Sequence, residues 1–544
     1  MTAALRGADI LARALAQAGV KHLFSLSGNQ IMPVYDATHE SGQVIHHVRH
    51  EGAAVHMADA WARMTGEVGI ALLTGGPGHA NGIGALYTAL ASESPLVMLS
   101  GHAPLKELHK GAFQEMRQAD MAAPVVKAAF TAQSAATLGA DIARAMRHAR
   151  FGRPGPVHLS LPFDVLEDKV ADGAACIPGA DAFTVKPIPL SESAAGAVLA
   201  ELARARRPLI LAGPAMSNDR GRAALAALSA ACGVPAICME SPRGVNDPCL
   251  GAFPTMLAQA DLVVLLGKQP DFTLKFGQPP ALAKDARFIV LDPDPEGLRR
   301  AGYALGDPSR IALAALAEPF AAAAALAAAG RPLPGGWAGE VAAALRHRPA
   351  AWDGIATAKG APAHPVQVGR AVQAYIDASP DPVLVCDGGE FGQWAQACVS
   401  APTRIINGPA GAIGSALPFA LAAKLARPQS TVVAMMGDGT FGFHAMEFDT
   451  AVRESLPVLA VVGNDACWNA EHQIQIRSYG AARTVGCTLL PTRYEAVAVA
   501  LGGHGEFAGE AAALGPALSR AAASGKPACV NAMIEGLPAP AVHA

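Results

Sequence analysis

The sequence predicts an α/β protein with three doubly wound domains, each built on a parallel sheet. Short apolar runs such as "GIALLTGG", "ADLVVLLGKQP" and "STVVAMMGDG" alternate along the chain with longer Ala- and Leu-rich helical patterns. Two stretches rich in proline and glycine, at about 168–190 and 328–364, interrupt this alternation. We therefore expect three domains, and we list their boundaries as residues 1–168, 188–328 and 360–544.

Each predicted domain contains several apolar runs that stop at a glycine, a serine or another turn residue. Such runs are typical of strands buried on both faces of a parallel sheet, and the longer patterns between them supply the covering helices. The runs are at 21–28, 69–76, 95–101 and 155–161 in the first domain, 207–218, 260–270 and 286–295 in the second, and 381–394, 430–439, 457–465 and 527–534 in the third.

The balance of charged and apolar residues limits the kinds of partner. Charged residues are 16% of the 544-residue chain, below the usual ~25%, and hydrophobic residues are 51%. This balance favours burial of surface in an oligomer. The formal net charge of −3, without a basic block, argues against nucleic acid as a partner. The nine cysteines include no CxxC pair, which predicts a reduced, cytoplasmic protein.

No segment has the pattern of a membrane span or a signal peptide. The most apolar stretch, 311–330, is mostly alanine and is interrupted by Glu318 and Pro319. In the first 20 residues the apolar positions recur at helical spacing and are broken by charged residues. We expect a soluble protein that does not bind a membrane.

Two aspartates follow two neighbouring predicted strands of the last domain. Asp438 lies in the turn "GDG" after the first strand, and Asp465 ends the second. Glycines let the backbone approach a ligand, and the helix predicted from Thr440 would direct free N–H groups toward a diphosphate. Ligands of doubly wound sheets lie at the carboxyl ends of strands, and Mg²⁺ binds a few protein oxygens together with phosphate oxygens. The pattern predicts a Mg²⁺ site that holds a diphosphate, although an ordinary turn with Asp438 as helix cap stays open.

Several segments, in order along the chain, resemble the thiamine-diphosphate (ThDP) enzymes of the acetolactate synthase-like family. "HHVRHEGAAVHMADAWARMTG" is similar to the family's RHE-AA-MADGYAR segment, "LLTGGPGHANG" to its TSGPG-TN stretch and "GAFQE" to its AFQE loop. "GPAGAIGSALPFALAAKLA" resembles the GTMG-GLPAAIGA helix. The GDG–NN motif matches residues 437–465, with "GND" where the family usually has "NN". The resemblance covers the whole chain and implies a pyrimidine-binding domain, a central nucleotide-binding-like domain and a diphosphate-binding domain.

The resemblance implies catalytic residues on the first domain. Glu51 matches the glutamate that hydrogen-bonds the pyrimidine ring of the coenzyme; without this match, a glutamate in such a segment is more often a surface carboxylate, here paired with Arg49 or His50. Gln114 and Asn29 lie on segments that match substrate-facing loops of the family. Thr74 and His79 are further candidates near the substrate, and His79 is the weakest because a histidine in a polar turn is more often solvated or a cap.

The resemblance also implies the residues that bind the coenzyme and the metal. The metal ligands would be Asp438, Asp465 and Cys467, the last through its main-chain carbonyl, and Asn464 replaces Asp465 if the register shifts by one residue. The coenzyme-binding set comprises Glu51, Thr74, Pro77, Asn81, Gly389, Glu390, Phe391, Ile413, Gly437, Asp438, Gly439, Thr440 and Asp465, with Ile413 under the two rings.

Three functions are compatible with the resemblance. The first is acetolactate synthase-like decarboxylation of a 2-keto acid and carboligation through a C2 carbanion, dependent on ThDP and Mg²⁺. The second is a 2-hydroxyacyl-CoA lyase or oxalyl-CoA decarboxylase, because "VVLLGKQPDFTLKFGQPP" and "VVGNDACW" are similar to segments of such enzymes, although we find no basic tail for a CoA phosphate. The third is a non-catalytic scaffold of the same fold.

The resemblance leaves a second cofactor and the assembly as expectations. "ILAGP" and "FIVLDPDP" end strands where relatives bind FAD or ADP, but "KQPDF" stands where synthases have an RFDDR-like run, which puts FAD in doubt. The implied active site takes Glu51 and the GDG turn from different subunits. This implies a homodimer or a homotetramer acting on a small keto acid or an acyl-CoA.

Overall fold

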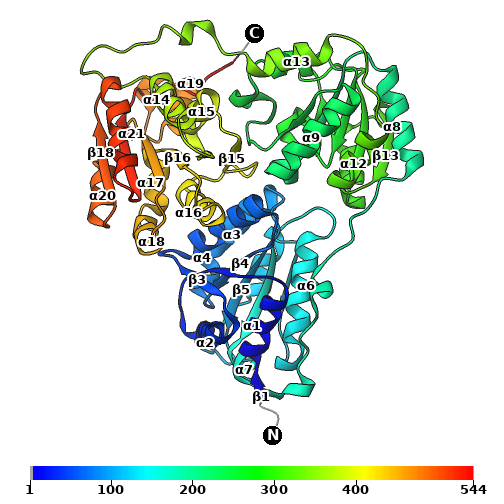
Figure 1. The fold of residues 1–544 in the computed structure, drawn as a ribbon, viewed down its shortest axis with the longest axis vertical. Coiled ribbons are helices and arrows are strands. Elements are labelled where there is room, and N and C mark those ends of the chain that lie inside the picture. The colour runs from blue at the N-terminus through cyan, green and yellow to red at the C-terminus, as the bar shows by residue number, and fades with distance from the viewer. Residues whose placement is uncertain (1–3, 543–544) are drawn as a thin grey trace. The chain divides into compact units, whose positions relative to one another are not determined.

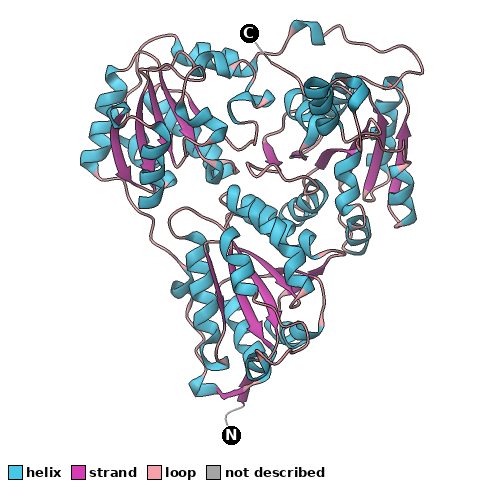
Figure 2. Cartoon of the chain, turned by 180° about the vertical axis from the view of Figure 1, so that it is seen from behind, coloured by secondary structure: helices cyan, strands magenta, loops and turns pink. Residues whose placement is uncertain are grey.

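The computed structural model describes residues 4–542. It contains three parallel sheets, each flanked by helices, and one two-stranded antiparallel sheet (Figure 1 and Figure 2). By their contacts, residues up to Lys186, together with Leu421–Ala426 and Asp449–Glu454, form one compact unit, and the rest of the chain forms a second. The prediction of an α/β protein with three parallel-sheet domains is confirmed.

The first unit contains a six-stranded parallel sheet in the order β3-β2-β4-β5-β7-β6. Its strands are β2 (His22–Ser25), β3 (Val44–His47), β4 (Gly69–Leu73), β5 (Leu96–His102), β6 (Ala128–Thr131) and β7 (Val157–Pro162). Its helices are α1 (Gly7–Gln17), α2 (Met32–Ser41), α3 (Glu51–Thr65), α4 (Pro77–Ala91), α5 (Gln118–Ala122), α6 (Leu138–Arg150) and α7 (Phe163–Glu167).

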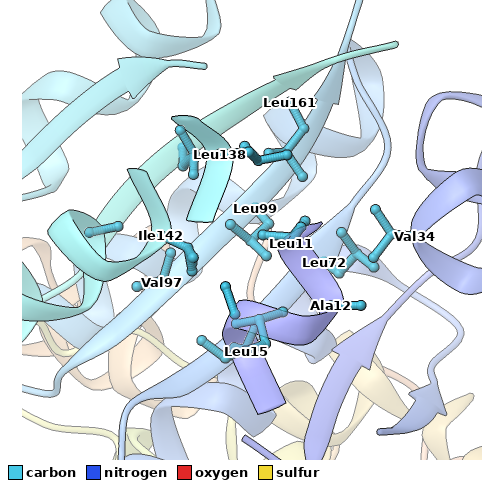
Figure 3. Close-up of a cluster of buried hydrophobic side chains, with 14 of the residues drawn as sticks. Leu11, Ala12, Leu15, Val34, Leu72, Val97, Leu99, Leu138, Ile142 and Leu161 are labelled. Carbon is cyan, nitrogen blue, oxygen red and sulfur yellow. The ribbon is translucent and has the colours of Figure 1, made fainter. Parts of the chain in front are cut away.

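Apolar side chains bury one face of this sheet against helices (Figure 3). Leu72 of β4 and Leu99 of β5 pack in one cluster with Leu11 of α1 and Leu138 and Ile142 of α6. All five residues of β4 and all seven of β5 are buried, as expected for strands covered on both faces. The core fixes the strand ends, and the loops that follow them carry the predicted site residues.

The second unit begins with a five-stranded parallel sheet in the order β10-β9-β11-β12-β13. Its strands are β9 (Pro208–Ala212), β10 (Ala236–Cys238), β11 (Leu262–Leu266), β12 (Arg287–Asp292) and β13 (Ile311–Leu316). Its helices are α8 (Glu192–Arg204), α9 (Asp219–Cys232), α10 (Phe253–Leu257), α11 (Pro295–Leu305), α12 (Pro319–Ala329) and α13 (Trp337–Arg346). Two separate apolar clusters cover the two faces of this sheet.

The last sheet has six parallel strands in the order β15-β14-β16-β17-β19-β18. Its strands are β14 (Val383–Cys386), β15 (Thr403–Ile406), β16 (Val432–Gly437), β17 (Leu459–Asn464), β18 (His504–Ala508) and β19 (Ala528–Met533). The helices of this region are α14 (Pro365–Asp377), α15 (Gly389–Cys398), α16 (Ala416–Ala426), α17 (Asp438–His444), α18 (Glu447–Arg453), α19 (Asn469–Tyr479), α20 (Tyr494–Ala500) and α21 (Leu514–Ala523).

The first and last sheets share one topology. In each, the second strand along the chain is at the edge, the first is beside it, and the chain then crosses to the far side of the first strand. The order therefore reverses between β2 and β4 in one sheet and between β14 and β16 in the other. Ligands of doubly wound sheets bind beside such a reversal, at the carboxyl ends of the strands.

The structure assigns secondary structure to two stretches singled out in the sequence, the most apolar one at 311–330 and the proline- and glycine-rich one at 168–190. The apolar stretch 311–330 is β13 followed by α12, because Pro319 opens the helix at its first position. The stretch at 168–190 begins with β8 (Lys169–Ala171), which pairs antiparallel with β1 (Ala4–Arg6). Within residues 4–542 no helix is long and apolar enough to cross a membrane.

Candidate active site

A cavity of about 390 Å³ opens in the second unit at the carboxyl ends of β14, β16 and β17. It lies at the reversal of strand order predicted for a ligand site. Ten residues predicted from the sequence line it: Gly389, Glu390, Phe391, Ile413, Gly437, Asp438, Gly439, Thr440, Asp465 and Cys467.

Two carboxylates face each other in this cavity. Asp438 is only 3% exposed. Its Oδ1 accepts the Gly439 N–H at 2.9 Å, while Oδ2 has no hydrogen-bond partner among residues 4–542. Burial raises the pKa of Asp438 to about 6, and burial together with the charge of Asp438 raises the pKa of Asp465 to about 7. Both shifts show that ionised carboxylates are disfavoured here unless a cation compensates them.

The donor set suits a hard divalent cation that also binds phosphate. Among residues 4–542 no group of three or more His, Cys, Asp or Glu side chains is placed to hold a metal, so two carboxylates need oxygens from elsewhere. Mg²⁺ takes such oxygens from main-chain carbonyls, water and phosphate. The cavity has room for a diphosphate beside these carboxylates, because its volume is about 390 Å³ and its lining there includes Gly389, Gly437 and Gly439, which have no side chains. The residues present therefore fit both a cation and a diphosphate.

Asn464, the alternative second ligand, does not line the cavity. Its Nδ2 donates to the Thr492 carbonyl at 2.9 Å and to Asn531 Oδ1 at 3.2 Å, and its Oδ1 accepts the Ala466 N–H at 3.2 Å. This amide joins β17 to β19 and to the loop before α20. Of the two neighbours, only Asp465 faces the cavity.

Asp387, which the sequence reasoning missed, shapes the floor of the cavity. It is fully buried at the end of β14, and its carboxylate accepts N–H groups from Gly388, Gly414 and Ala416. These bonds tie the N-terminus of α15 to the turn that presents Ile413. An aspartate directly after a buried strand and before two glycines was the signal that could have revealed it.

The cavity also contains charged and aromatic residues that the motifs did not reveal. Arg243, in the loop after β10, lies 3.5 Å from the Glu390 carboxylate. Burial raises the pKa of Glu390, and Arg243 opposes that shift. Trp468 contacts Phe443 edge to face, with ring centroids 6.3 Å apart. A guanidinium and an indole thus line the same cavity as the two aspartates.

Glu51 lies in the first unit, at the first position of α3. It is 8% exposed, and its Oε2 accepts a hydrogen bond from Asn81 Nδ2 on α4 at 3.0 Å. A Cβ at Gly78 would lie 3.2 Å from Glu51 Oε1, so the glycine gives the carboxylate room to lie close to α4. Glu51 is therefore a buried, oriented carboxylate, and the surface alternative is wrong.

Gln114 belongs to a polar network that passes through Gln30. Gln30 Nε2 donates to Gln114 Oε1 at 2.8 Å, and Thr74 Oγ1 donates to Gln30 Oε1 at 2.5 Å. Gln30 is buried, whereas the predicted Asn29 is exposed one position earlier. The loops after β2 and β4 thus meet the Gln114 loop through Gln30 and Thr74, and the sequence pattern did not distinguish the two neighbours.

His79 and Pro77, at the start of α4, have opposite surroundings. Pro77 is exposed at the first turn of the helix. His79 is fully buried, with Nδ1 3.0 Å from Ser100 Oγ and its ring in contact with His158. Burial lowers the pKa of His79 to about 4, so the ring is neutral at physiological pH. A solvated or capping role for His79 is wrong.

In the central sheet, the predicted nucleotide position is at the ends of β9 and β12. Asp292, the last residue of β12, is buried, and its carboxylate accepts hydrogen bonds from Gln269 Nε2 at 2.5 Å and from the Asp294 N–H at 3.0 Å. FAD or ADP in this domain stays a prediction.

Three family models match the chain in the order of its three sheets. They are described as thiamine pyrophosphate enzyme N-terminal TPP binding domain (residues 5–121), central domain (196–316) and C-terminal TPP binding domain (387–532). The last model spans Asp438, Asp465 and most of the cavity lining, and the first spans Glu51 and Asn81.

Individual relatives match nearly the whole chain. The acetolactate synthase large subunit IlvG of Mycobacterium tuberculosis is 34% identical over 539 residues, which are 97% of this chain and 95% of the relative. The 2-hydroxyacyl-CoA lyase 2 of Bos taurus is 32% identical over 545 residues, 92% of this chain and 84% of the relative. The 2-hydroxyacyl-CoA lyase of Oryza sativa subsp. japonica is 29% identical over 558 residues, 97% and 95% of the two chains. The chain therefore belongs to the thiamine pyrophosphate enzymes, as a thiamine-diphosphate-dependent enzyme of the acetolactate synthase or 2-hydroxyacyl-CoA lyase type.

Proposed function

We propose that the enzyme decarboxylates a small 2-keto acid and joins the remaining fragment to a second carbonyl compound, with Mg²⁺ as its metal. The observation that carries the proposal is the pair of buried aspartates, one with an unpartnered oxygen, in a cavity at the strand reversal. The match between 97% of this chain and 95% of an acetolactate synthase large subunit supports the reaction type. The relatives thus support the proposed reaction, and the geometry of the cavity supports the proposed binding of the coenzyme.

Thiamine diphosphate, when bound, supplies a carbon nucleophile that adds to carbonyl groups and accepts the electrons of a breaking C–C bond. Glu51 would share a proton with a ring nitrogen of the coenzyme, since a buried carboxylate facing a basic nitrogen exchanges a proton readily. Asn81 orients the carboxylate through its hydrogen bond to Oε2. Glu51 would thus act as the proton-holding group of the site.

The second unit would hold the charged end of the coenzyme. Asp438, Asp465 and the main-chain carbonyl of Cys467 would bind Mg²⁺, and the cation would bind the diphosphate. The remaining contacts would come from residues that line the cavity: Gly389, Glu390, Phe391, Gly437, Gly439 and Thr440, with Ile413 against the rings.

The first unit would supply the rest of the site from a second subunit. Thr74, Pro77 and Asn81 lie on the turn and first helical turns after β4, and the Gln114 loop packs against the Gly76 of that turn. We propose that Gln114 faces the substrate, and that Asn29 lies at the outer edge of the same region. A homodimer or homotetramer would join Glu51 of one subunit to the Asp438 turn of another.

Cleavage of a 2-hydroxyacyl-CoA is the second candidate. Relatives named 2-hydroxyacyl-CoA lyase match 92–97% of the chain, and "GND" with the following Trp468 resembles the corresponding segment of such lyases. Both reactions make or break a bond beside a carbonyl, so the same Glu51 and metal residues would serve either. The substrate therefore has to be identified by direct assay.

The test uses coenzyme-free protein to which ThDP and Mg²⁺ are returned. We expect a rise in melting temperature only when both are present, followed by turnover of pyruvate; 2-hydroxyacyl-CoA and oxalyl-CoA are assayed in parallel by mass spectrometry. Turnover of a CoA ester without turnover of any keto acid would replace the first candidate by the second. If ThDP with Mg²⁺ does not raise the melting temperature, the proposal that the coenzyme binds in this cavity is wrong.

Glu51→Gln tests the proton-holding role. The amide keeps the size of the side chain but cannot exchange the proton, so turnover should fall by about 10²–10⁴-fold while stabilisation by ThDP and Mg²⁺ remains. Glu40→Gln, a change at an exposed glutamate of α2, is the matched control and should keep full activity. Wild-type turnover by Glu51→Gln would show that another group holds the proton.

A further inference from the structure

A second, larger cavity lies in the second unit, away from the proposed coenzyme site. It has a volume of about 960 Å³ and shares no lining residue with the coenzyme cavity. On one side it is lined by the edge strand β10 and by α9, and on the other by the end of α15 and the start of β15, which is also an edge strand. No residue of β11, β12 or β13 lines it, so it is distinct from the crevice at the reversal of strand order between β9 and β11.

The charge around this cavity is strongly positive. Five arginines line it, against two carboxylates, Glu240 and Asp353. Arg404 is paired with Glu240 at 2.6 Å, and Arg222 with Asp219. The other three arginines have no carboxylate partner among the residues that the structure describes.

These three arginines are held or presented in different ways. Arg348 donates to four main-chain carbonyls, among them Ala397 at 2.6 Å and Cys249 at 3.1 Å, which fixes the guanidinium between the two domains without neutralising it. Arg370 is exposed and donates to two carbonyls before α14. Arg346 is exposed and makes no hydrogen bond or ion pair with any residue in 4–542. The charge of all three is available to an anion.

A buried amide without partners supplies a second, independent sign of a ligand. Gln396 lines the cavity and is 1% exposed, yet neither its Nε2 nor its Oε1 has a hydrogen-bond partner within the described part of the chain. Buried amides are nearly always paired, because leaving both groups unpaired costs stability. A ligand that both accepts and donates hydrogen bonds would satisfy this amide.

From these observations we propose that the cavity between β10 and β15 is a binding site for a small organic anion. The anion's phosphate or carboxylate group is bound by Arg346 and Arg370 together with the fixed charge of Arg348, and Gln396 pairs with polar groups of the ligand at the buried end. The indole of Trp352 and apolar residues such as Leu345 and Val366 contact its apolar or aromatic body. Because both domains line the cavity, the bound anion also strengthens their contact.

The test titrates holoenzyme, saturated with ThDP and Mg²⁺ so that the coenzyme site is filled. The probes are phenyl phosphate, benzoate and the neutral benzyl alcohol. Their binding is measured by calorimetry and by tryptophan fluorescence, to which Trp352 in the cavity lining contributes. We expect phenyl phosphate or benzoate to bind in the millimolar range or tighter, and benzyl alcohol at least tenfold more weakly. The stronger of the two anions tells whether the natural ligand carries a phosphate or a carboxylate. Equal binding of all three probes, or binding of none, would overturn the proposal.

Two variants separate this site from nonspecific anion binding. The double variant R346A/R370A should weaken binding of the anion at least tenfold, whereas R299A/R300A, which removes the same charge from exposed positions of α11, should leave it unchanged. Equal losses in the two double variants would indicate a general charge effect and overturn the site.

The variant Gln396→Leu tests whether the buried amide of Gln396 binds the anion. Leucine removes both unpaired polar groups, so the ligand-free protein should melt at a higher temperature than wild type. The same variant should lose the stabilisation that the anion gives the wild-type protein. A variant that binds the anion as wild type does would show that Gln396 takes no part in binding and would overturn its assigned role.

Discussion

Asp465 is the residue at which this chain departs from the NN pattern of its family. The carboxylate lies beside Asp438 in the coenzyme cavity, and its pKa is raised to about 7 by burial and by that neighbour. Because the folded pKa lies above the ordinary value, ionisation of Asp465 costs stability as pH rises toward and through about 7. The extra charge is useful only when a cation compensates it.

The variant Asp465→Asn tests whether the charge of Asp465 lowers the stability of the metal-free protein and strengthens the binding of Mg²⁺. At pH 8 the metal-free variant should be more stable than wild type by about 1–3 kcal/mol, because one of two facing charges is gone. Its affinity for Mg²⁺ should fall by about tenfold, because a carboxamide is a weaker ligand for a hard cation. Thermal denaturation in EDTA and in a Mg²⁺ series with ThDP measures both effects, with Asp285→Asn at an exposed position as control. A variant that loses stability in EDTA would contradict the argument.

The junction of β14 and α15 determines the shape of the coenzyme cavity at the scale of secondary structure. There the Asp387 carboxylate accepts hydrogen bonds from three main-chain N–H groups. Gly389 adopts a φ of 76°, which lets the chain turn directly into the helix. A Cβ at Gly388 would lie 2.9 Å from Ile413, so this turn and the Ile413 turn pack without a gap. The position of Ile413 therefore depends on a carboxylate that lies beneath the cavity surface.

Asp387→Ala should disturb both stability and coenzyme binding. Three buried N–H groups lose their acceptor, which should cost about 2–4 kcal/mol of unfolding free energy. ThDP should bind more weakly because the Ile413 turn is no longer held. Urea denaturation and a ThDP titration in saturating Mg²⁺ measure the two effects. The control is Asp377→Ala, at an exposed end of α14. Wild-type values in both experiments would mean that the turn is held by other contacts.

At the scale of the whole molecule, the proposed assembly predicts that two inactive variants restore each other. If Glu51 and Asp438 of one active site come from different subunits, Glu51→Gln and Asp438→Asn are each inactive alone. In mixed dimers one site carries both changes and the other carries neither. Unfolding and refolding the two variants together should recover up to about a quarter of wild-type activity. Light scattering checks that the mixture has the size of the wild-type oligomer, and a mixture with no recovered activity would place both residues in the same subunit.

The sequence predicted where the strands lie along the chain, but it did not predict which strands are neighbours in a sheet. Runs such as 262–266 and 432–437 are continuous and apolar because both faces of the strand are covered, and this signal is local. Strand order is set by contacts between distant segments, so the pattern did not reveal that the first and last sheets share one topology. The same limit applies to Gln30 and Asp387, whose roles follow from burial against distant loops.

The sequence by itself determined the fold class and the segments that build the coenzyme cavity, because apolar runs, glycine turns and the aspartates after two strands are local features. Only the tertiary structure decided which of two neighbouring residues faces a site: Gln30 joins the network and Asn29 is exposed, while Asp465 lines the cavity and Asn464 joins β17 to β19. Asn464 and Asp465 lie at the end of a strand, where successive side chains point to opposite sides, whereas Asn29 and Gln30 lie in a 3-10 turn, where they point in different directions. In both cases, which side chain is buried depends on what the rest of the chain brings there. The arginine-lined cavity with Gln396 arises in the same way, since it exists only where two sheet edges meet.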